Sequence, residues 1–219
     1  CAMAEVIVAA TWVTYSRVTS NHASGTIYLN IAGTLFKTIG CRGNVKCGVT
    51  AQGIVYWEFE FTGLFVQPAA QAVPAVNIGS QLSAFPQIAD STNTPVFTLG
   101  GTPHVLRSLT LDLGNQVVPR LLIGSEQVII PNFAETVEAM IEAVPLATLN
   151  PYALAVSGTT QALVLQHGIG AGKIMTLNVP RAQHQRPGSP TQQDGIVEWP
   201  LKLLPLPDTG NDQLTIAFT

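Results

Sequence analysis

The sequence predicts an all-β protein, namely an antiparallel β-sandwich or barrel with one short helix and a long arm or loop. Apolar and polar residues alternate along the chain, most clearly in residues 54–65, where Trp57, Phe59 and Phe61 share one face. Turns rich in Gly, Asn, Asp and Pro divide the chain into about a dozen strand-like segments, a number typical of sandwiches and barrels. No uncharged apolar run reaches the roughly 18 residues that a membrane-spanning helix needs.

The strand-like segments follow one another closely along the chain. A turn with Asn21 and Gly25 separates the first two, and Ala32-Gly33 forms a tight hairpin turn after the second. Leu214, Ile216 and Phe218 alternate with milder residues in the last segment. The expected strands are residues 11–18, 26–31, 34–39, 44–50, 54–65, 105–113, 116–123, 127–130, 161–166, 173–179 and two within 195–219.

Residues 66–95 have a different composition. Pro68, Pro74, Pro86 and Pro95 recur among Ala, Gln, Ser and Asn, and little periodicity is present. Such a segment is either a flexible linker between two domains or a long arm that becomes ordered against a partner. We expect a single domain over residues 1–219, with 66–95 inserted as a long loop or arm between two β halves.

One segment of the second half has helical spacing instead. Phe133, Val137, Met140, Ile141 and Val144 recur at intervals of three and four residues. The pattern alone therefore predicts a helix over residues 134–144.

A short helix is also expected after Asn150. Asn is a good N-cap and Pro151 suits the first helical position, while Gly158 suits the end of the helix.

The composition restricts the possible functions. Charged residues make up 11% of the chain, against about 25% in an ordinary soluble protein. Large apolar surfaces usually mark interfaces, so a subunit covered by neighbouring copies is expected. The net charge of −3 and only ten scattered Lys and Arg residues argue against specific binding of nucleic acid. The three cysteines contain no CxxC pair, which suits synthesis in a reducing cytoplasm.

Motifs of enzymes and cofactor sites do not stand out. The glycine-rich residues 168–173 end in Gly-Lys, but His167 occupies the first position of a phosphate-binding loop and Ile174 replaces its Ser or Thr. A hairpin turn is the better interpretation. The four histidines lack metal-binding spacing, and His184 is expected in a solvated loop. Glu58 and Glu60 could suggest glycosidase carboxylates, but two acids on one strand face are common. We therefore expect no catalytic residue, no cofactor and no metal.

Several motifs in a fixed order resemble the tail tube proteins (major tail proteins) of long-tailed bacteriophages. The resemblance extends from Cys1 to Thr219. The motifs are GCRGNV at residues 40–45, similar to the family's GARGNV; FTGL at 61–64; SLTLDLGNQVV at 108–118, similar to SL-x-LDLGN-x-VV; HGIGAGKI at 167–174; and GNDQLTIAFT at 210–219.

The resemblance implies a non-enzymatic virion subunit. Such subunits form rings, hexameric in this family, that stack into a tube, and strands of each subunit join an inter-subunit β-barrel around the channel. Implied partners are other copies of the chain and the tape measure, tail terminator and baseplate or tip proteins. The genome would pass through without specific binding, and no membrane is involved. Localisation would be the tail of the virion, after assembly in the bacterial cytoplasm.

The resemblance also bears on particular segments. The family has a β-strand where this chain reads VEAMIEAVPLAT at residues 137–148, so a strand is preferred there over the helix. Family members carry a further N-terminal segment with additional strands, which is expected to be cleaved or to lie outside this chain. Passage of DNA calls for an acidic or neutral lumen, and the candidate lumen-facing acids are Glu58, Glu60, Glu138 and Glu142.

Two functions from other classes remain as alternatives. An outer-membrane β-barrel would carry girdles of aromatic residues, whereas aromatic residues make up 7% of this chain. A carbohydrate-binding β-sandwich on the virion surface would expose aromatic platforms, whereas Trp12, Trp57 and Trp199 lie in alternating runs that predict core positions.

Overall fold

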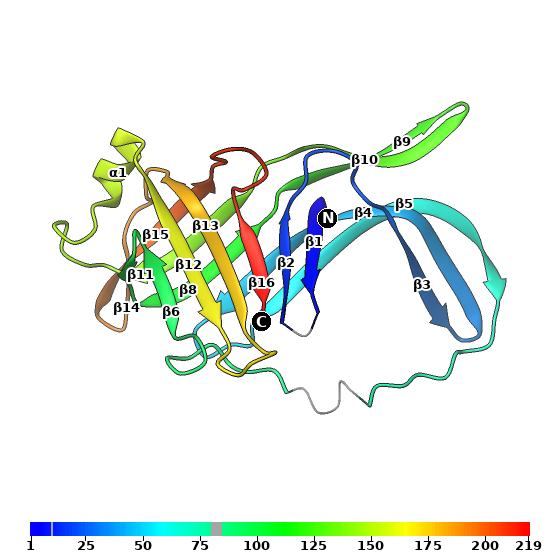
Figure 1. Cartoon of the computed structure of the whole chain (residues 1–219), viewed down its shortest axis with the longest axis horizontal. Helices are drawn as coiled ribbons and strands as arrows, with labels where there is room; N and C mark the ends of the chain where they lie inside the picture. Colours follow the sequence, from blue (N-terminus) through cyan, green and yellow to red (C-terminus); the bar gives the residue numbers. More distant parts are fainter. Residues whose placement is uncertain (10, 80–84) are drawn as a thin grey trace.

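A computed structural model describes residues 1–9, 11–79 and 85–219 and confirms an almost entirely antiparallel β fold with one short helix (Figure 1). One sheet of 14 strands folds back into two layers. In order, the first layer contains β14 (Thr191–Gln193), β15 (Ile196–Pro205), β11 (Thr136–Glu142), β8 (Leu106–Asp112), β4 (Thr34–Thr50) and β5 (Tyr56–Ala70), and β3 (Gly25–Ile31) pairs with the outer half of β4.

The second layer packs against the first and is joined to it at one edge. In order, it contains β1 (Met3–Val8), β2 (Trp12–Arg17), β16 (Thr215–Phe218), β13 (Met175–His184), β12 (Thr160–His167), β6 (Val96–Leu99) and β7 (Thr102–Pro103). The end of β13 leaves β16 and pairs with β15 of the first layer. Pro180 lies between these two halves of β13, at a point where its missing N–H breaks no ladder with either strand.

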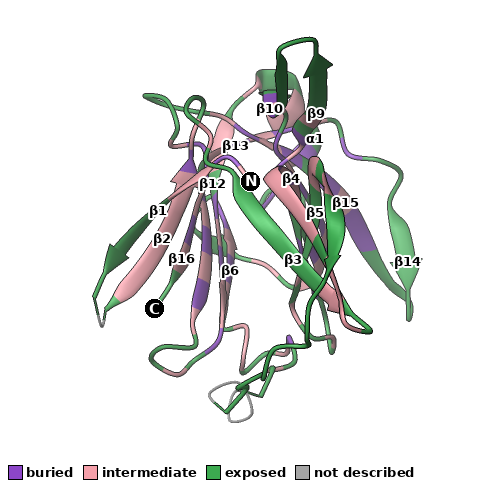
Figure 2. Cartoon of the chain, turned by 90° about the vertical axis from the view of Figure 1, so that its right-hand side faces the viewer, coloured by how far each residue is buried: buried purple, intermediate pink, exposed green. Residues whose placement is uncertain are grey.

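The hydrophobic core lies between the two layers, where buried residues line both inner faces (Figure 2). Leu109, Leu111 and Ile141 come from the first layer, and Leu165 and Leu177 come from the second. Of the three tryptophans predicted to lie in the core, Trp199 is buried and Trp12 and Trp57 are half-buried.

Residues 136–142 form a strand, so the helical pattern was misleading and the prediction of a strand is confirmed. Val137, Ala139 and Ile141 are buried with a period of two, and β11 pairs with β8 on one edge and β15 on the other. Phe133, which completed the helical spacing, belongs to the preceding strand β10 (Ser125–Phe133).

The short helix α1 (Pro151–Ser157) is confirmed with its predicted ends. The side chain of Asn150 accepts a hydrogen bond of 2.9 Å from the N–H of Ala153. Gly158 has a φ of 69° and donates its N–H to Leu154 O, a helix end that glycine adopts without steric cost.

The predicted break between residues 39 and 44 was wrong. β4 continues through it because Gly40, with a φ of 61°, and Cys41 form a bulge opposite Gly63 of β5.

The segment 66–95 is shorter than predicted. β5 continues to Ala70, which pairs with Thr34, so the irregular stretch begins at Gln71. It is anchored again where Ile88 pairs with Ile54 and where Ala89 N–H bonds to Gly53 O. Residues 80–84 of the predicted arm lie outside the described residues.

Two parts of the chain project from the sandwich (Figure 1). The hairpin of β9 (Asn115–Leu122) and β10 forms a separate two-stranded sheet. The outer halves of β4 and β5, together with β3, form a three-stranded extension, which we call the wing (residues 25–39 and 64–70).

His184 is buried, so the prediction of a solvated loop was wrong. β13 extends to this residue, and His184 Nε2 lies 3.0 Å from Gln161 Oε1. Burial lowers the pKa of His184 to about 4. The sequence did not show this because Pro180 and the polar residues around it resemble a strand end.

Acid is expected to destabilise the fold through His184. Between pH 6.5 and about 4, the unfolded chain binds a proton at His184 that the folded chain does not bind. The free energy of unfolding should therefore fall by roughly 2 kcal/mol as the pH is lowered through this window. Urea denaturation at several pH values measures it, and the same slope in His184→Gln would refute the assignment.

Candidate functional site

The first layer has one face in the core and one face that carries charged side chains. Register places Glu60 opposite Asn44 and Glu58 opposite Lys46, and Lys46 in turn opposite Asp112. Glu138 lies opposite Lys202 in the same layer. We call this surface the charged face, and it comprises Asn44, Lys46, Glu58, Glu60, Asp112, Glu138, Glu142 and Lys202.

Two ion pairs connect neighbouring strands across the charged face. Lys46 Nζ lies 3.2 Å from Asp112 Oδ2, and Lys202 Nζ lies 3.3 Å from Glu138 Oε1. All four side chains are partly exposed, so both pairs are expected to add little to stability. Their main consequence is to neutralise two of the acids.

Asp112 is the best-held acid of the charged face. Its Oδ1 accepts hydrogen bonds from Asn44 Nδ2 at 2.7 Å and from Gly114 N–H at 2.8 Å. Burial acts to raise the pKa of Asp112, but these hydrogen bonds and Lys46 outweigh it, so the pKa lies below its usual value. The hydrogen bond to Asp112 raises the pKa of Lys46, and the charges of Glu58 and Glu60 add to this effect.

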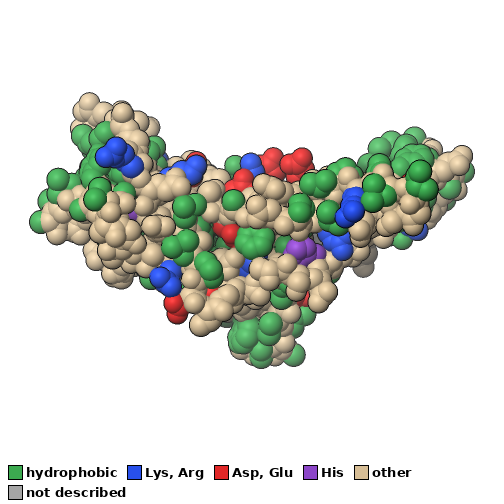
Figure 3. All heavy atoms as spheres, turned by 90° about the horizontal axis from the view of Figure 1, so that it is seen from above, with side chains coloured by type: hydrophobic (Ala, Val, Ile, Leu, Met, Phe, Trp, Pro, Cys, Tyr) green, Lys and Arg blue, Asp and Glu red, His purple; other side chains and the backbone are tan. Residues whose placement is uncertain are grey.

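Because of Glu58 and Glu60, the charged face carries more acidic than basic side chains. Both side chains are exposed, and within residues 1–9, 11–79 and 85–219 neither has an ion-pair partner within 4.0 Å. Acidic side chains gather beside basic ones near the middle of the molecule as seen from above (Figure 3).

The structure brings three of the four predicted acids onto one exposed surface, and the fourth lies at its border. Glu142 is half-buried and pairs in register with Glu198, a buried acid that receives a hydrogen bond from Arg107. Asp112 alternates with Leu111 and Leu113 in the sequence, a pattern that places it on the polar side of its strand. Its partner Lys46 was missed because register between distant strands is not visible in a sequence.

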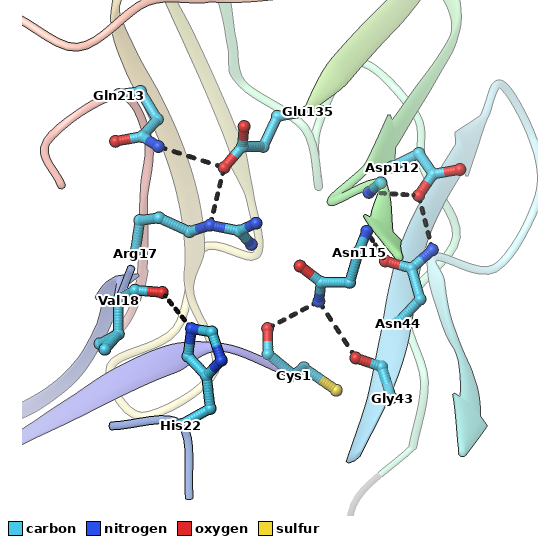
Figure 4. Close-up of polar contacts among 11 residues, drawn as sticks. Cys1, Arg17, Val18, His22, Gly43, Asn44, Asp112, Asn115, Glu135 and Gln213 are labelled. Carbon is cyan, nitrogen blue, oxygen red and sulfur yellow. Dashed lines mark hydrogen bonds and ion pairs between the residues drawn. The ribbon is translucent and has the colours of Figure 1, made fainter. Parts of the chain in front are cut away.

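A buried amide holds the base of the β9–β10 hairpin against the charged face (Figure 4). Asn115 Nδ2 donates to Cys1 O at 2.9 Å and to Gly43 O at 3.0 Å. The N–H of Asn115 donates to Asn44 Oδ1 at 3.0 Å, and Asn44 in turn holds Asp112. The hairpin and the acids are therefore positioned by one hydrogen-bond network.

A buried ion pair lies near this network (Figure 4). Arg17 Nε is 3.0 Å from Glu135 Oε1, and both side chains are almost fully buried. Gln213 Nε2 donates to the same carboxylate oxygen at 3.2 Å. The guanidinium carbon of Arg17 lies 3.6 Å from the centre of the Phe133 ring. Three distant parts of the chain thus meet at one charge pair.

The remaining sequence features fit structural roles. The glycine-rich residues 168–173 join the antiparallel strands β12 and β13, as expected of a hairpin turn. The three cysteines are free, and burial raises the pKa of Cys47 to about 12. In the described part of the chain, no three His, Cys, Asp or Glu residues cluster as metal ligands would. No helix in that part is long and apolar enough to cross a membrane.

Comparisons of the sequence with protein-family models and with curated proteins found no match. The resemblance to tail tube proteins rests on the sequence motifs. The motif at residues 40–45 lies on β4 and includes Asn44, and the motif at 108–118 lies on β8 and β9 and includes Asp112 and Asn115.

Proposed function

We propose that this protein is the structural subunit of a bacteriophage tail tube, polymerising as stacked hexameric rings around a channel for the genome. The observation that carries the proposal is the first layer of the sandwich: one face is core, the other is charged with an acidic surplus, and one edge is open.

The open edge belongs to β5. This strand spans 15 residues and pairs with β4 on one side, and no other described strand pairs with it. An unpaired edge of this length invites pairing with another chain, and typical strands are only about 5–6 residues long. Pairing of β5 with a neighbouring copy around a ring would close the layers into one barrel without free edges.

The charged face suits the wall of such a channel. DNA carries one negative charge per about 1.7 Å of its axis, and clustered basic groups would hold it by releasing counterions. Exposed Glu58 and Glu60 repel phosphate, and Lys46 and Lys202 are each occupied by an acid. We infer that the genome slides past this face without adhering.

The irregular segment that begins at Gln71 is the proposed bridge between rings. Val73, Val76 and Ile78 are exposed on it, as suits a segment that orders against a neighbouring copy. Ring-to-ring contact is heterologous, so stacking stays open until a partner ends it. From the resemblance, the proposed partners are the tape measure, tail terminator and baseplate or tip proteins, within the virion tail.

Electron microscopy of the purified chain over a concentration series tests the proposal. We expect rings or hollow tubes with a central channel. Discrete monomers at every concentration would refute it.

A further inference from the structure

The wing carries apolar side chains on one of its two faces. Register places Leu29 opposite Phe36 and Thr38 opposite both Ile27 and Phe65. Directly paired residues project to the same face of an antiparallel sheet. We call this surface the wing face, and it comprises Ile27, Leu29, Ile31, Phe36 and Phe65, all of them exposed.

The wing face continues the hydrophobic core beyond the second layer. Trp57, Phe59 and Phe61 of β5 lie on its core side, where Phe59 and Phe61 stack with ring centres 6.0 Å apart. The bulge near Gly40 lies in β4, so the alternation of β5 carries on unbroken to Phe65. Trp57 is half-buried, whereas Phe59 and Phe61 are exposed, so this sheet face loses its cover before the wing begins and stays uncovered through it.

The opposite face of the wing carries polar contacts within the chain. Tyr28 lies beneath the amine of Lys37, at 5.6 Å from the ring centre. Asn30 Nδ2 donates to the carbonyl oxygens of Gln71 and Ala72. The chain's own arm therefore leaves from this opposite side, and its first residues do not cover the wing face.

The wing face is large for an apolar patch on a monomer and would supply more than half of one partner's share of a standard interface. Five large apolar side chains at these exposures amount to on the order of 500 Å², near the upper end for a monomer's largest apolar patch. A standard interface buries about 800 Å² per partner, and obligate homo-oligomer interfaces resemble a domain core cut in half. The wing face continues the core directly, so it resembles such an exposed half of a core.

We propose that a second copy of this chain covers the wing face. The inference rests on the proposed function for its place within a ring or between rings, but the contact itself needs only a second copy. The second copy then covers the wing face as the second layer covers the inner face of the first layer in the sandwich.

Adjacent residues of β3 provide a matched test. Leu29 lies on the wing face with 55% of its surface exposed, and Tyr28 lies on the opposite face with 62% exposed. Leu29→Glu is expected to raise the critical concentration for self-association at least about tenfold, because it places an unpaired charge in an apolar contact. Tyr28→Glu should leave that concentration within about twofold of the unchanged chain. Sedimentation velocity over a concentration series measures both.

A second variant of the wing face controls for misfolding of the wing. Phe65 is 83% exposed, so Phe65→Ser should fold normally by circular dichroism and still lose self-association. Equal loss in Tyr28→Glu, undiminished association of both wing-face variants, or a wild-type chain that stays monomeric would each overturn the inference.

The two proposals fail in different ways. Tubes that form equally well from Leu29→Glu would overturn the wing contact and leave the tube function standing. Closed oligomers without a channel that Leu29→Glu disrupts would support the wing contact and refute the tube.

Discussion

Replacement of Glu135 by Gln is expected to lower the free energy of unfolding by about 3–5 kcal/mol. The side chains of Glu135 and Arg17 are 5% and 0% exposed, so the substitution leaves a guanidinium charge in the interior without its counter-ion. Burial lowers the pKa of Arg17, and only Glu135 opposes that effect. The loss is a large part of the roughly 5–15 kcal/mol that stabilises a typical domain.

Guanidinium chloride denaturation measures this loss of stability. Two further variants show whether the buried charge is its cause. Glu138→Gln removes the same charge from the exposed pair with Lys202 and should cost less than about 1 kcal/mol. Arg17→Met combined with Glu135→Leu removes both buried charges and should recover most of the stability. Similar small losses for Glu135→Gln and Glu138→Gln would show that the buried pair is not critical.

The Arg17–Glu135 pair also fixes the base of the projecting β9–β10 hairpin. Arg17 ends β2, Glu135 follows the projecting β10, and Gln213 precedes the last strand. Loss of the pair should therefore loosen the β9–β10 hairpin before it disturbs the distant strands β12 and β6. Hydrogen exchange of the β9 and β10 amides would rise first in Glu135→Gln.

Alternation predicted most strands because burial on one side of a sheet imposes a period of two. Residues 108–113 show this well, with Leu109, Leu111 and Leu113 fully buried. β11 shows the limit, since its residues fit a helical spacing equally well until hydrogen-bonding neighbours are known. Those neighbours, β8 and β15, are about 30 and 60 residues away and invisible to a local pattern.

Other features escaped prediction for different physical reasons. β1 is largely exposed on both faces, so no alternation marks it. The bulge in β4 resembles a turn in sequence because glycine serves both. Alternation placed Glu58 and Glu60 on one face of their strand, whereas Glu138 was a candidate from the resemblance, and its partner Lys202 lies on another strand. Glu142 differs because the neighbouring acid Glu198 is buried at that end of the face.

Replacing both Glu58 and Glu60 by lysine is expected to make assembled tubes hold DNA. Each subunit would then present two lysines in place of the two exposed acids that lack ion-pair partners in the described residues, and a ring repeats the change in every subunit. Affinity for DNA should rise at least about a hundredfold at low salt, and its logarithm should fall linearly with the logarithm of salt concentration.

Exposed acids away from the charged face give a control with the same change in net charge. Glu126 lies on the projecting hairpin and Asp194 in the turn between β14 and β15, and Glu126→Lys with Asp194→Lys should leave DNA retention low. Retention of short duplexes by pelleted tubes measures both variants. Equal retention by the two double variants would mean that DNA responds to overall charge. No retention by either variant would mean that the charged face does not contact DNA. Retention confined to the Glu58 and Glu60 variant would place these two acids on the wall of the channel, because only there does a local reversal meet the passing phosphates.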